Sequence, residues 1–587
     1  MRTLRVLALP SVFCLLASLA TTAQAQTPDR PKVYVIVIDG LDGDRVDAGG
    51  APFIKSLLEG KEGAAATYYR ESRSTMIAET NPNHTSMATG AYGGSSGIPG
   101  NAFAVYGEPP NEDGCPSSGI DESKTPVATS GEDPSCLLAE TLFQSLDRQD
   151  GAGISTAGIF GKPKLGRIFS GKRPDGRYWA DYLWVPCEEP GDDTPYCKQV
   201  PINPVTRYAA DDSIVMDEVI RAAREDNHDY TFVNLPQVDS AGHATGAGSV
   251  YDEAITMADG QIRRFVEAQR QLGLWGSRTV LLLVSDHSMD TTPEKTSLGD
   301  RFRAAGIPSD AYTVVQNGSA SLVYLSNRTD PGRFALLKRM REAALGTGNA
   351  AAVLSGAGPI SEALYREDNP ADGGAANTLR AVHPAWALEG SRTGDLVVTH
   401  DAGGAFNDPI NPLAGNHGGP QTRDNFMAVI GPASMVQQAT PPGEASAGFD
   451  DTARNPNQSE NVDVAPTVAR LLGFSEPRDS QGRVLGEALL AGGLPPVRQD
   501  SARGKLKLAV SPKRVRAGRR VRYTVRATSG GRAVARARIS LGGKKLRTNS
   551  RGRAVATIRF GKPGLKRARG GAARLRKGNA YVRVLRR

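Results

Sequence analysis

Acidic residues are absent from one end of this chain of 587 residues. Residues 501–587 contain 29 lysines and arginines but no aspartate or glutamate. The other 42 of the 71 basic residues and all 62 acidic residues lie in residues 1–500, which carry a net charge of −20. This split excludes one uniformly charged domain and predicts two parts with different roles. We expect the basic part to bind an anionic partner, with an anionic polymer at the cell surface, nucleic acid and lipid headgroups as the candidates.

Long hydrophobic runs are almost absent as well. The exception runs from Val6 to Leu19, after Arg2 and Arg5 and before an Ala-Gln-Ala sequence at residues 23–25. This is the pattern of a secretory signal peptide over residues 1–25, and the run is too short to span a bilayer comfortably. We therefore expect a secreted or cell-envelope protein with no transmembrane segment in the mature chain.

Cysteine is scarce, with five residues in the chain. One lies in the predicted signal peptide, which leaves Cys115, Cys136, Cys187 and Cys197. An even number in an exported protein favours disulfides. Three connectivities are possible, and pairing of sequence neighbours, Cys115–Cys136 and Cys187–Cys197, is preferred. A four-cysteine zinc site is less favoured because no C-x-x-C spacing is present.

Buried strands alternate with amphipathic helices in the acidic part. Apolar runs that indicate strands lie at residues 32–40, 153–162, 230–235, 279–287, 395–399 and 426–431, and helical patterns lie at 211–224, 251–272 and 462–472. This alternation predicts an α/β domain over residues 28–491, with a mainly parallel sheet flanked by helices. Residues 111–206 are predicted to form in part a loop-rich insertion over the strand ends, stiffened by disulfides, and residues 292–398 a second insertion with its own strand and helix.

The basic part follows a predicted linker at residues 492–504. Short segments of alternating apolar and polar residues, separated by glycine-rich turns, predict a small all-β sandwich over residues 505–587. This segment resembles the immunoglobulin-like modules that are often appended to bacterial exported enzymes.

Polar side chains gather where the predicted parallel strands end. Asp39, Lys162, Asp239, Asp286 and His287 all occupy such positions, where α/β sheets bind their ligands. Histidine is rare, with seven residues, and two more of them have suggestive contexts: His243 lies four residues after Asp239, and His417 lies in a glycine-rich loop. Carboxylates with imidazoles suit zinc or a similar divalent ion, and six such ligands suffice for two metals. His84 and His400 are assigned structural roles, and His228 and His383 are expected at the surface.

Thr80 begins a helix-compatible segment, T-N-P-N-H, just after residues 76–79. A threonine at a helix start commonly caps the helix through its side-chain oxygen. A helix N-terminus also attracts phosphate, so the same hydroxyl is placed to act as a nucleophile on a phosphoryl group. With the six candidate ligands, the second interpretation is favoured, and Thr80 is predicted to cap the helix as well.

These motifs together resemble the alkaline phosphatase superfamily, in its threonine-nucleophile branch. That branch includes type I phosphodiesterases/nucleotide pyrophosphatases, certain bacterial alkaline phosphatases and phosphonoacetate hydrolases. The matching motifs run in family order between about residues 32 and 489: VIVIDG, TNPNH, GIPGN with Asn101, DSAGH, SDHSM and GNHGG. The basic part lies outside the resemblance.

The resemblance implies two Zn²⁺ ions, or similar divalent metals, and a covalent phosphothreonine. Asp39, Asp286 and His287 would hold the metal that also binds Thr80. The second metal would be held by Asp239, His243 and His417. Asn101 would donate to a non-bridging oxygen of the substrate, as an oxyanion donor does.

The substrate class is less closely specified than the reaction. Nucleotide-cleaving relatives usually carry an aromatic residue after the nucleophile, where this chain has Asn81. The pair Lys162 and Lys164 resembles an element of phosphonoacetate hydrolases, and extra cations favour a dianionic monoester or a carboxylated substrate. The alternative is that both are solvent-exposed loop lysines. The leading interpretation is a phosphodiesterase-like hydrolase of small phosphorylated substrates, with a phosphomonoesterase or phosphonoacetate hydrolase as alternatives.

A further alternative belongs to a different class of protein. In it, the chain is chiefly a surface-retained binding protein that acts through the basic residues 505–587. Both roles can coexist, with catalysis in the acidic part and retention in the basic part.

Overall fold

A computed structural model describes residues 30–106, 115, 122–150, 153–173, 175–201, 210–347, 360–406, 413–440, 458–497, 506–529, 532–534, 537–549, 551–572 and 575–586. The predicted signal peptide and most of the predicted linker lie outside these residues. The chain divides into two compact units, Met1–Val497 (unit 1) and Arg498–Arg587 (unit 2).

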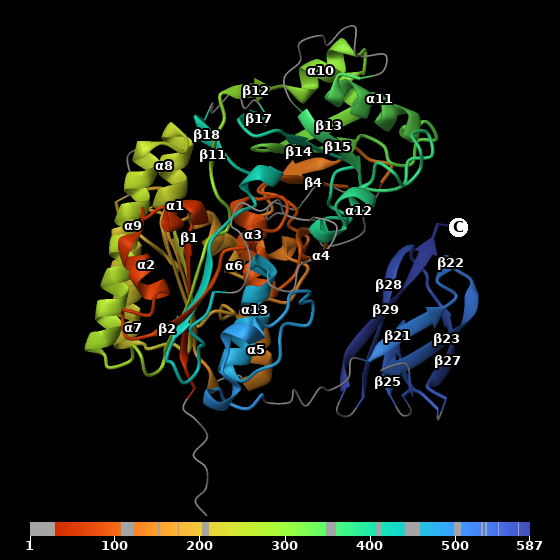
Figure 1. The fold of residues 1–587 in the computed structure, drawn as a ribbon. Helices are drawn as coiled ribbons and strands as arrows, with labels where there is room; N and C mark the ends of the chain where they lie inside the picture. Colours follow the sequence, from red (N-terminus) through yellow and green to blue (C-terminus); the bar gives the residue numbers. More distant parts are fainter. Residues whose placement is uncertain are drawn as a thin grey trace, which may run out of the picture. The chain divides into compact units, whose positions relative to one another are not determined.

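An eight-stranded sheet forms the centre of unit 1 (Figure 1). Its parallel strands are β10 (Thr279–Val284), β1 (Lys32–Ile38), β9 (Tyr230–Leu235), β6 (Thr156–Phe160), β7 (Tyr182–Pro186) and β8 (Cys197–Lys198), in that spatial order. The other edge is completed by β19 (Met427–Gly431), antiparallel to β10, and β2 (Ala65–Tyr69), antiparallel to β19. The prediction of a mainly parallel sheet is confirmed.

Successive residues of β1 show why this strand needs cover on both faces. Val33, Val35 and Val37 enter one hydrophobic cluster, and Tyr34 and Ile36 enter the other. The first cluster packs against α5 (Leu142–Asp150), α6 (Pro163–Phe169) and α13 (Val464–Leu472), with α3 (Thr80–Thr89) on the same side. The second packs against α1 (Gly43–Asp47), α2 (Pro52–Leu58), α7 (Asp212–Glu225), α8 (Gln237–Thr245) and α9 (Ser249–Gln271). Continuous apolar strands of this kind are typical of sheets buried on both faces.

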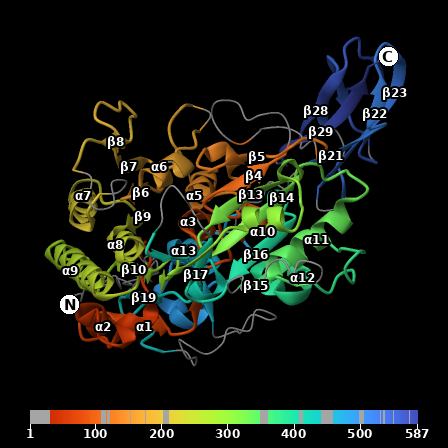
Figure 2. The ribbon, with the colours of Figure 1, turned by 90° about the horizontal axis from the view of Figure 1, so that it is seen from above.

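A second sheet is built by the predicted insertion after β10. Its antiparallel strands are β13 (Tyr312–Asn317), β14 (Ala320–Leu325), β16 (Leu396–His400) and β15 (Ile360–Tyr365). The nearby helices are α10 (Leu298–Ala304), α11 (Arg333–Leu345) and α12 (Leu379–Val382), and Figures 1 and 2 show this layer beside the end of the main sheet where β1 ends. The prediction that residues 395–399 join the parallel sheet is wrong, because a buried apolar run does not specify its neighbours.

Short elements join these layers. Two-stranded pairs form between β3 (Ser72–Arg73) and β20 (Ser459–Glu460), β4 (Phe103–Val105) and β5 (Val127–Thr129), β11 (Asp290–Thr291) and β18 (Gly415–Asn416), and β12 (Glu294–Thr296) and β17 (Gly404–Phe406). A short helix, α4 (Gly93–Ser96), follows α3. The disulfides Cys115–Cys136 and Cys187–Cys197 both form, which confirms the preferred pairing. No described helix combines the length and apolar character that a membrane span needs.

Unit 2 consists of two antiparallel-rich sheets around one apolar core. One contains β21 (Lys507–Ser511), β23 (Arg520–Ser529), β24 (Arg532–Ala533) and β27 (Arg553–Arg559). The other contains β22 (Arg514–Arg516), β29 (Leu575–Leu585), β28 (Gly564–Ala572), β25 (Arg538–Leu541) and β26 (Lys544–Arg547). Tyr523, Val525, Ile539 and Val582 are among the core residues. The predicted all-β part is present.

Candidate active site

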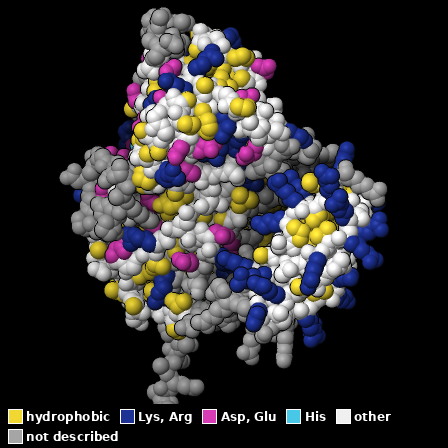
Figure 3. Space-filling model, turned by 90° about the vertical axis from the view of Figure 1, so that its right-hand side faces the viewer, with side chains coloured by type: hydrophobic (Ala, Val, Ile, Leu, Met, Phe, Trp, Pro, Cys, Tyr) yellow, Lys and Arg dark blue, Asp and Glu magenta, His cyan; other side chains and the backbone are white. Residues whose placement is uncertain are grey.

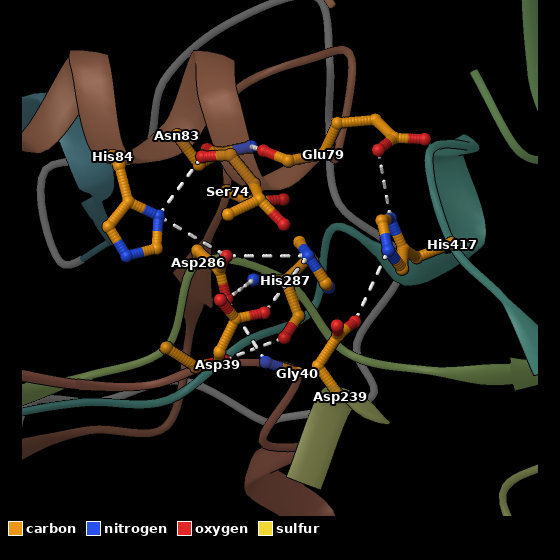
Figure 4. A network of polar contacts seen from close by, with 12 residues as sticks. Asp39, Gly40, Ser74, Glu79, Asn83, His84, Asp239, Asp286, His287 and His417 are labelled. Atoms are coloured by element: carbon orange, nitrogen blue, oxygen red, sulfur yellow. Dashed lines mark hydrogen bonds and ion pairs between the residues drawn. The ribbon is translucent and has the colours of Figure 1, made fainter. Parts of the chain in front are cut away.

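The ends of the parallel strands bring the candidate ligands together in unit 1 (Figure 4). Asp39 directly follows β1, and Asp286 and His287 follow β10. The His287 Nε2 atom lies 3.4 Å from Asp286 Oδ2 and 3.8 Å from Asp39 Oδ1. These three residues form one group of possible metal ligands, as the sequence predicts.

The second group gathers around Asp239, which lies in α8 just after β9. Its Oδ1 atom is 3.3 Å from Nε2 of both His243 and His417. His243 lies one helical turn after Asp239, so the two side chains share a helix face. His417 reaches the same point from the loop after β18, and its Nε2 is 3.1 Å from that of His243. A further set of possible ligands in this region combines Asp239 and His417 with His287, which also belongs to the first group.

Backbone carbonyls fix the orientation of all three imidazoles. Nδ1 lies 3.1 Å from the Gly415 carbonyl in His243, 3.0 Å from the Ser288 carbonyl in His287 and 3.0 Å from the Ala78 carbonyl in His417. A carbonyl oxygen can only accept, so each Nδ1 carries the proton. The lone pair is then on Nε2, the atom directed at the carboxylates, and this arrangement is typical of metal-binding histidines.

Several atoms that could bind a metal also lack hydrogen-bond partners. Among the described residues, Asp239 Oδ1, Asp286 Oδ2 and His287 Nε2 are fully buried and accept no hydrogen bond. Leaving such atoms unsatisfied is costly. Three buried carboxylates, Asp39, Asp239 and Asp286, also need positive charge nearby. Both observations fit divalent metal ions.

Two of the three imidazoles are already in the neutral state that metal binding needs. Burial lowers the pKa of His243 to about 4 and that of His287 to about 3, so both are neutral ligands at pH 7. Burial and the neighbouring Asp286 raise the pKa of Asp39 to about 7. For His417, burial lowers the pKa but Glu79 and Asp239 outweigh it, which brings the pKa to about 9. Metal binding at His417 must therefore release a proton.

Thr80 is the first residue of α3, and its hydroxyl is directed at the same centre. Its Oγ1 lies 3.2 Å from Lys162 Nζ. The residue at the N-cap position is Glu79, and no side chain caps the helix. The expectation that Thr80 caps the helix is wrong, because a residue inside the first turn points its side chain away from the free N–H groups that a cap would satisfy.

Lys162 lies within the site rather than in solvent. Its ammonium donates to Asp39 Oδ1 at 2.9 Å and to Asp239 Oδ2 at 2.7 Å, so it links the two ligand groups. The alternative of a solvent-exposed loop lysine is wrong for this residue, which is 2% exposed. Lys164 lines the neighbouring cavity, and burial together with the charge of Lys162 lowers its pKa.

Asn101 is held beside Thr80 by the residues on either side of this threonine. Its Oδ1 accepts from the Asn81 backbone N–H at 2.8 Å, and its Nδ2 donates to the Glu79 carboxylate. An amide carries two N–H donors, so one remains to contact a substrate oxygen. The Asn81 side chain donates to the Asn101 and Ser130 carbonyls, at 3.3 and 3.4 Å.

Sequence reasoning missed Glu79 and Asn234. Glu79 is 3% exposed and lies 3.6 Å from His417 Nδ1, so it contacts both Asn101 and a predicted ligand. Its position directly before Thr80 was the available signal. Asn234, at the end of β9, donates to Asp39 Oδ2 at 2.7 Å and lies 3.1 Å from His84 Nε2. His84 therefore contacts Asn234, which in turn holds the candidate ligand Asp39.

The remaining histidines lie away from the site. His400 is buried against Thr296. The surface assignment of the other two is wrong: His228 is buried and stacks on Tyr182, and His383 is half-buried and stacks on Trp386.

A cavity of about 400 Å³ opens onto the site. It is lined by Thr80, Asn101, Lys162, Lys164, Asp239, His243 and His417, among others. Arg167 and its partners Glu132 and Glu188 also line it, with the Arg167–Glu188 pair at 2.5 Å. The arrangement combines a buried hydroxyl, two groups of candidate metal ligands, and amide and ammonium donors, which are the kinds of groups that phosphoryl transfer uses.

Comparisons with known proteins point in the same direction. The family model described as Type I phosphodiesterase / nucleotide pyrophosphatase matches residues 33–420, more than half of the chain. Comparison with the curated proteins found no match.

Solved structures share the fold. Murine ectonucleotide pyrophosphatase / phosphodiesterase 5 aligns with a TM-score of 0.53 at 15% identity, over 78% of this chain and 100% of that chain. The structure of an inactive variant of this murine protein in complex with AMP aligns with a TM-score of 0.51 at 15% identity, over 75% of this chain and 95% of that chain. The human protein of the same name aligns with a TM-score of 0.51 at 14% identity, over 75% of this chain and 94% of that chain.

Proposed function

Because this chain belongs to the type I phosphodiesterase / nucleotide pyrophosphatase family, a family of metal-dependent phosphoester hydrolases, we propose that it is a secreted two-zinc enzyme acting through a covalent phosphothreonine at Thr80. The observation that carries the proposal is that the Lys162 ammonium lies within hydrogen-bond distance of the Thr80 hydroxyl and of one carboxylate from each ligand group. Two zinc ions bound there would lower the pKa of the attacking hydroxyl and neutralise phosphoryl charge.

The chain's own residues support a two-step transfer. In the first step, Thr80 Oγ1 attacks phosphorus, the bond from phosphorus to the leaving oxygen breaks, and a phosphothreonine ester forms. Lys162, 3.2 Å from Oγ1, stabilises the deprotonated hydroxyl. The free N–H of Asn101 donates to a non-bridging oxygen. In the second step, water cleaves the phosphothreonine, which releases the phosphorylated product and restores the hydroxyl.

The first test separates metal-dependent covalent catalysis from other mechanisms. Hydrolysis of bis-nitrophenyl phosphate, nitrophenyl phosphate, a nucleotide pyrophosphate and phosphonoacetate is measured with and without chelator. We expect turnover that chelator abolishes and zinc restores, and no turnover in Thr80→Ala. Chelator-insensitive turnover, or full activity in Thr80→Ala, would refute the mechanism.

A diester or pyrophosphate is the leading substrate class because the family assignment favours it. AMP is bound by the murine relative, and in this chain a nucleotide would meet Asn81 rather than an aromatic ring after the nucleophile. This favours small phosphorylated substrates whose recognition does not depend on base stacking.

Lys164 favours a second candidate, a phosphomonoesterase or phosphonoacetate hydrolase. Among the described residues, its ammonium has no hydrogen-bond or ion-pair partner, although it lines the cavity. A cation so placed suits a second negative charge on the substrate. Lys164→Met should then reduce kcat/KM for a monoester or phosphonoacetate much more than for a diester, with Lys61→Met, at the surface, as the control. Equal losses for all substrates would exclude this candidate.

The proposal that the protein is exported rests on the signal-peptide pattern of residues 1–25. The two disulfides support an oxidising compartment. N-terminal sequencing of the protein recovered outside the cytoplasm should begin after residue 25. Retention of residue 1 in that fraction would contradict it.

A further inference from the structure

The described residues of unit 2 carry many positive charges and include no acidic side chain that could neutralise them. Its sequence from residue 501 onward has no side-chain carboxylate. Among its described residues, no lysine or arginine side chain donates a hydrogen bond or forms an ion pair. In Figure 3, Lys and Arg side chains surround an apolar patch on the face of this unit that is turned to the viewer. The charges therefore repel one another without compensation.

The outer face of the five-stranded sheet carries one set of these charges. Alternation along β25 and β29 turns Ile539, Val582 and Val584 inward, so their neighbours face outward. The pairing of the strands places the outward residues in rows across the sheet. The exposed cations of this face are Arg514, Arg516, Arg538, Lys545, Arg547, Arg567, Arg569 and Arg583.

The outer face of the other sheet carries a second set. Strand β27 alternates between buried and exposed residues over its whole length, and β23 does so in part. The exposed cations here are Lys507, Arg520, Arg522, Arg526, Arg553 and Arg559. Because the two sheets enclose one core, the two sets of cations face in opposite directions.

Several arginines lie directly opposite one another on neighbouring strands. In β23 and β27, Arg520 pairs with Arg559, and Arg526 pairs with Arg553. In the five-stranded sheet, Arg538 of β25 pairs with Arg547 of β26. Like charges directly opposite each other destabilise a sheet. A sheet built only for stability would not contain these pairs, whereas an anion lying across them would remove the repulsion.

We propose that unit 2 binds a flexible linear polyanion without aromatic groups, such as a phosphate polymer, which contacts both outer faces. A planar membrane or a stiff DNA duplex reaches only one of two opposite faces, and duplex DNA stays straight over about 150 base pairs. Single-stranded nucleic acid is bound mainly by stacking on exposed aromatic rings. Tyr581 is the one large aromatic side chain that is exposed among the described residues of unit 2.

Binding is tested with long-chain inorganic polyphosphate as the probe. The full chain carries Thr80→Ala, so that the polymer is not consumed, and the dissociation constant is measured by fluorescence anisotropy between 50 and 200 mM salt. With six or more contacts, we expect affinity to fall by about 10²–10³-fold over this range. Absence of binding at the lowest salt, or affinity that does not change with salt, overturns the proposal.

Two triple variants test whether both faces contribute. Arg567→Gln/Arg569→Gln/Arg583→Gln alters the five-stranded sheet, and Arg520→Gln/Arg522→Gln/Arg559→Gln alters the other. Each should reduce the slope of log Kd against log salt by about 2, because each lost contact removes about 0.7. The combined variant should reduce it by about 4.

The matched control removes three exposed arginines from unit 1, where each has an acidic partner: Arg177→Gln/Arg303→Gln/Arg380→Gln. For this control variant, the slope of log Kd against log salt should not change. Thermal unfolding of every variant checks folding, and because each unit 2 variant removes repulsion, its melting temperature should not fall. If one unit 2 variant abolishes binding while the other leaves it unchanged, the two-faced contact is wrong.

Two further probes separate the partners. Single-stranded poly(dT) of equal charge should bind no more tightly than polyphosphate, and phosphatidylglycerol vesicles should bind less tightly at equal phosphate. Tighter binding of poly(dT) would indicate recognition of bases. Tighter binding of vesicles would indicate a membrane partner. Either result overturns the proposal, and neither bears on the activity of Thr80.

Discussion

Gly318 joins the second sheet of unit 1 to the candidate metal centre. It lies between β13 and β14 with a φ of +59°, and a Cβ atom there would lie 2.0 Å from the His417 carbonyl oxygen and 2.6 Å from Asn416 Oδ1. The neighbouring Ser319 N–H donates to the same carbonyl at 2.7 Å. The loop that carries His417 is therefore packed against bare backbone.

Gly318→Ala should disable the site without unfolding the protein. Relieving the contact with the carbonyl to an ordinary 3.4 Å requires a shift of about 1.4 Å, and displacements near 1 Å cost about 10²-fold in rate. The loop carrying His417 is the element that moves, so metal affinity should fall about 10–100-fold as well. The alanine also costs about 1–2 kcal/mol of stability because of its left-handed conformation.

Gly346→Ala is the matched control, because its φ is +64° and no atom of the described residues lies within 4 Å of its added Cβ. It should show the same loss of stability with unchanged kcat/KM and zinc content. The measurements are kcat/KM with a nitrophenyl ester, zinc content by mass spectrometry after dialysis, and the melting temperature. Wild-type activity and zinc content in Gly318→Ala would refute the reasoning.

Three further predictions concern other residues. Glu79→Ala should lower kcat about 10²-fold because Asn101 loses the carboxylate that orients it, whereas Glu79→Gln, which keeps an acceptor oxygen, should retain most of the activity; equal losses would contradict this. Burial raises the pKa of Asp212 to about 7, so folding favours its protonated form, and stability should decline as pH rises from about 4 through 7. Denaturant unfolding at pH 5 and pH 8 should show a smaller decline in Asp212→Asn, and an equal decline would exclude Asp212 as its source. Replacing Cys187 and Cys197, which are 10 residues apart, by serines removes their disulfide. The free energy of unfolding, measured in guanidinium, should then fall by about 2.5–3 kcal/mol. An unchanged unfolding midpoint would contradict this prediction.

The elements of the parallel sheet could be predicted because their residues are buried on both sides. A strand such as β1 is apolar from Val33 to Ile38 and buried at every position, and this pattern together with the following helices indicates a buried strand in an α/β sheet. The same reasoning failed for β16, which begins with an apolar run and is also buried at every position, but which pairs with β14 and β15. Burial is encoded locally, whereas the choice of neighbouring strand is not.

The candidate site shows the same limit at the level of single side chains. Asp39, Asp286 and His287 were identified because they follow strands whose ends must meet at one edge of the sheet. Nothing local distinguishes a buried Lys162 from a solvent-exposed one, and its place between Asp39 and Asp239 follows from the packing of β6 beside β9. Glu79 was missed because its partners lie on distant loops.

The sequence by itself determined the kinds of chemistry available: a threonine at a helix start, carboxylates and imidazoles at strand ends, paired cysteines and a segment without acids. These follow from residue type and local periodicity, which act over a few residues. Only the tertiary structure decided which of these groups meet. It placed Lys162 against Thr80, put Glu79 beside Asn101 and held His417 against Gly318. In unit 2 it set arginines opposite one another across neighbouring strands, because strand pairing joins residues that the sequence keeps apart.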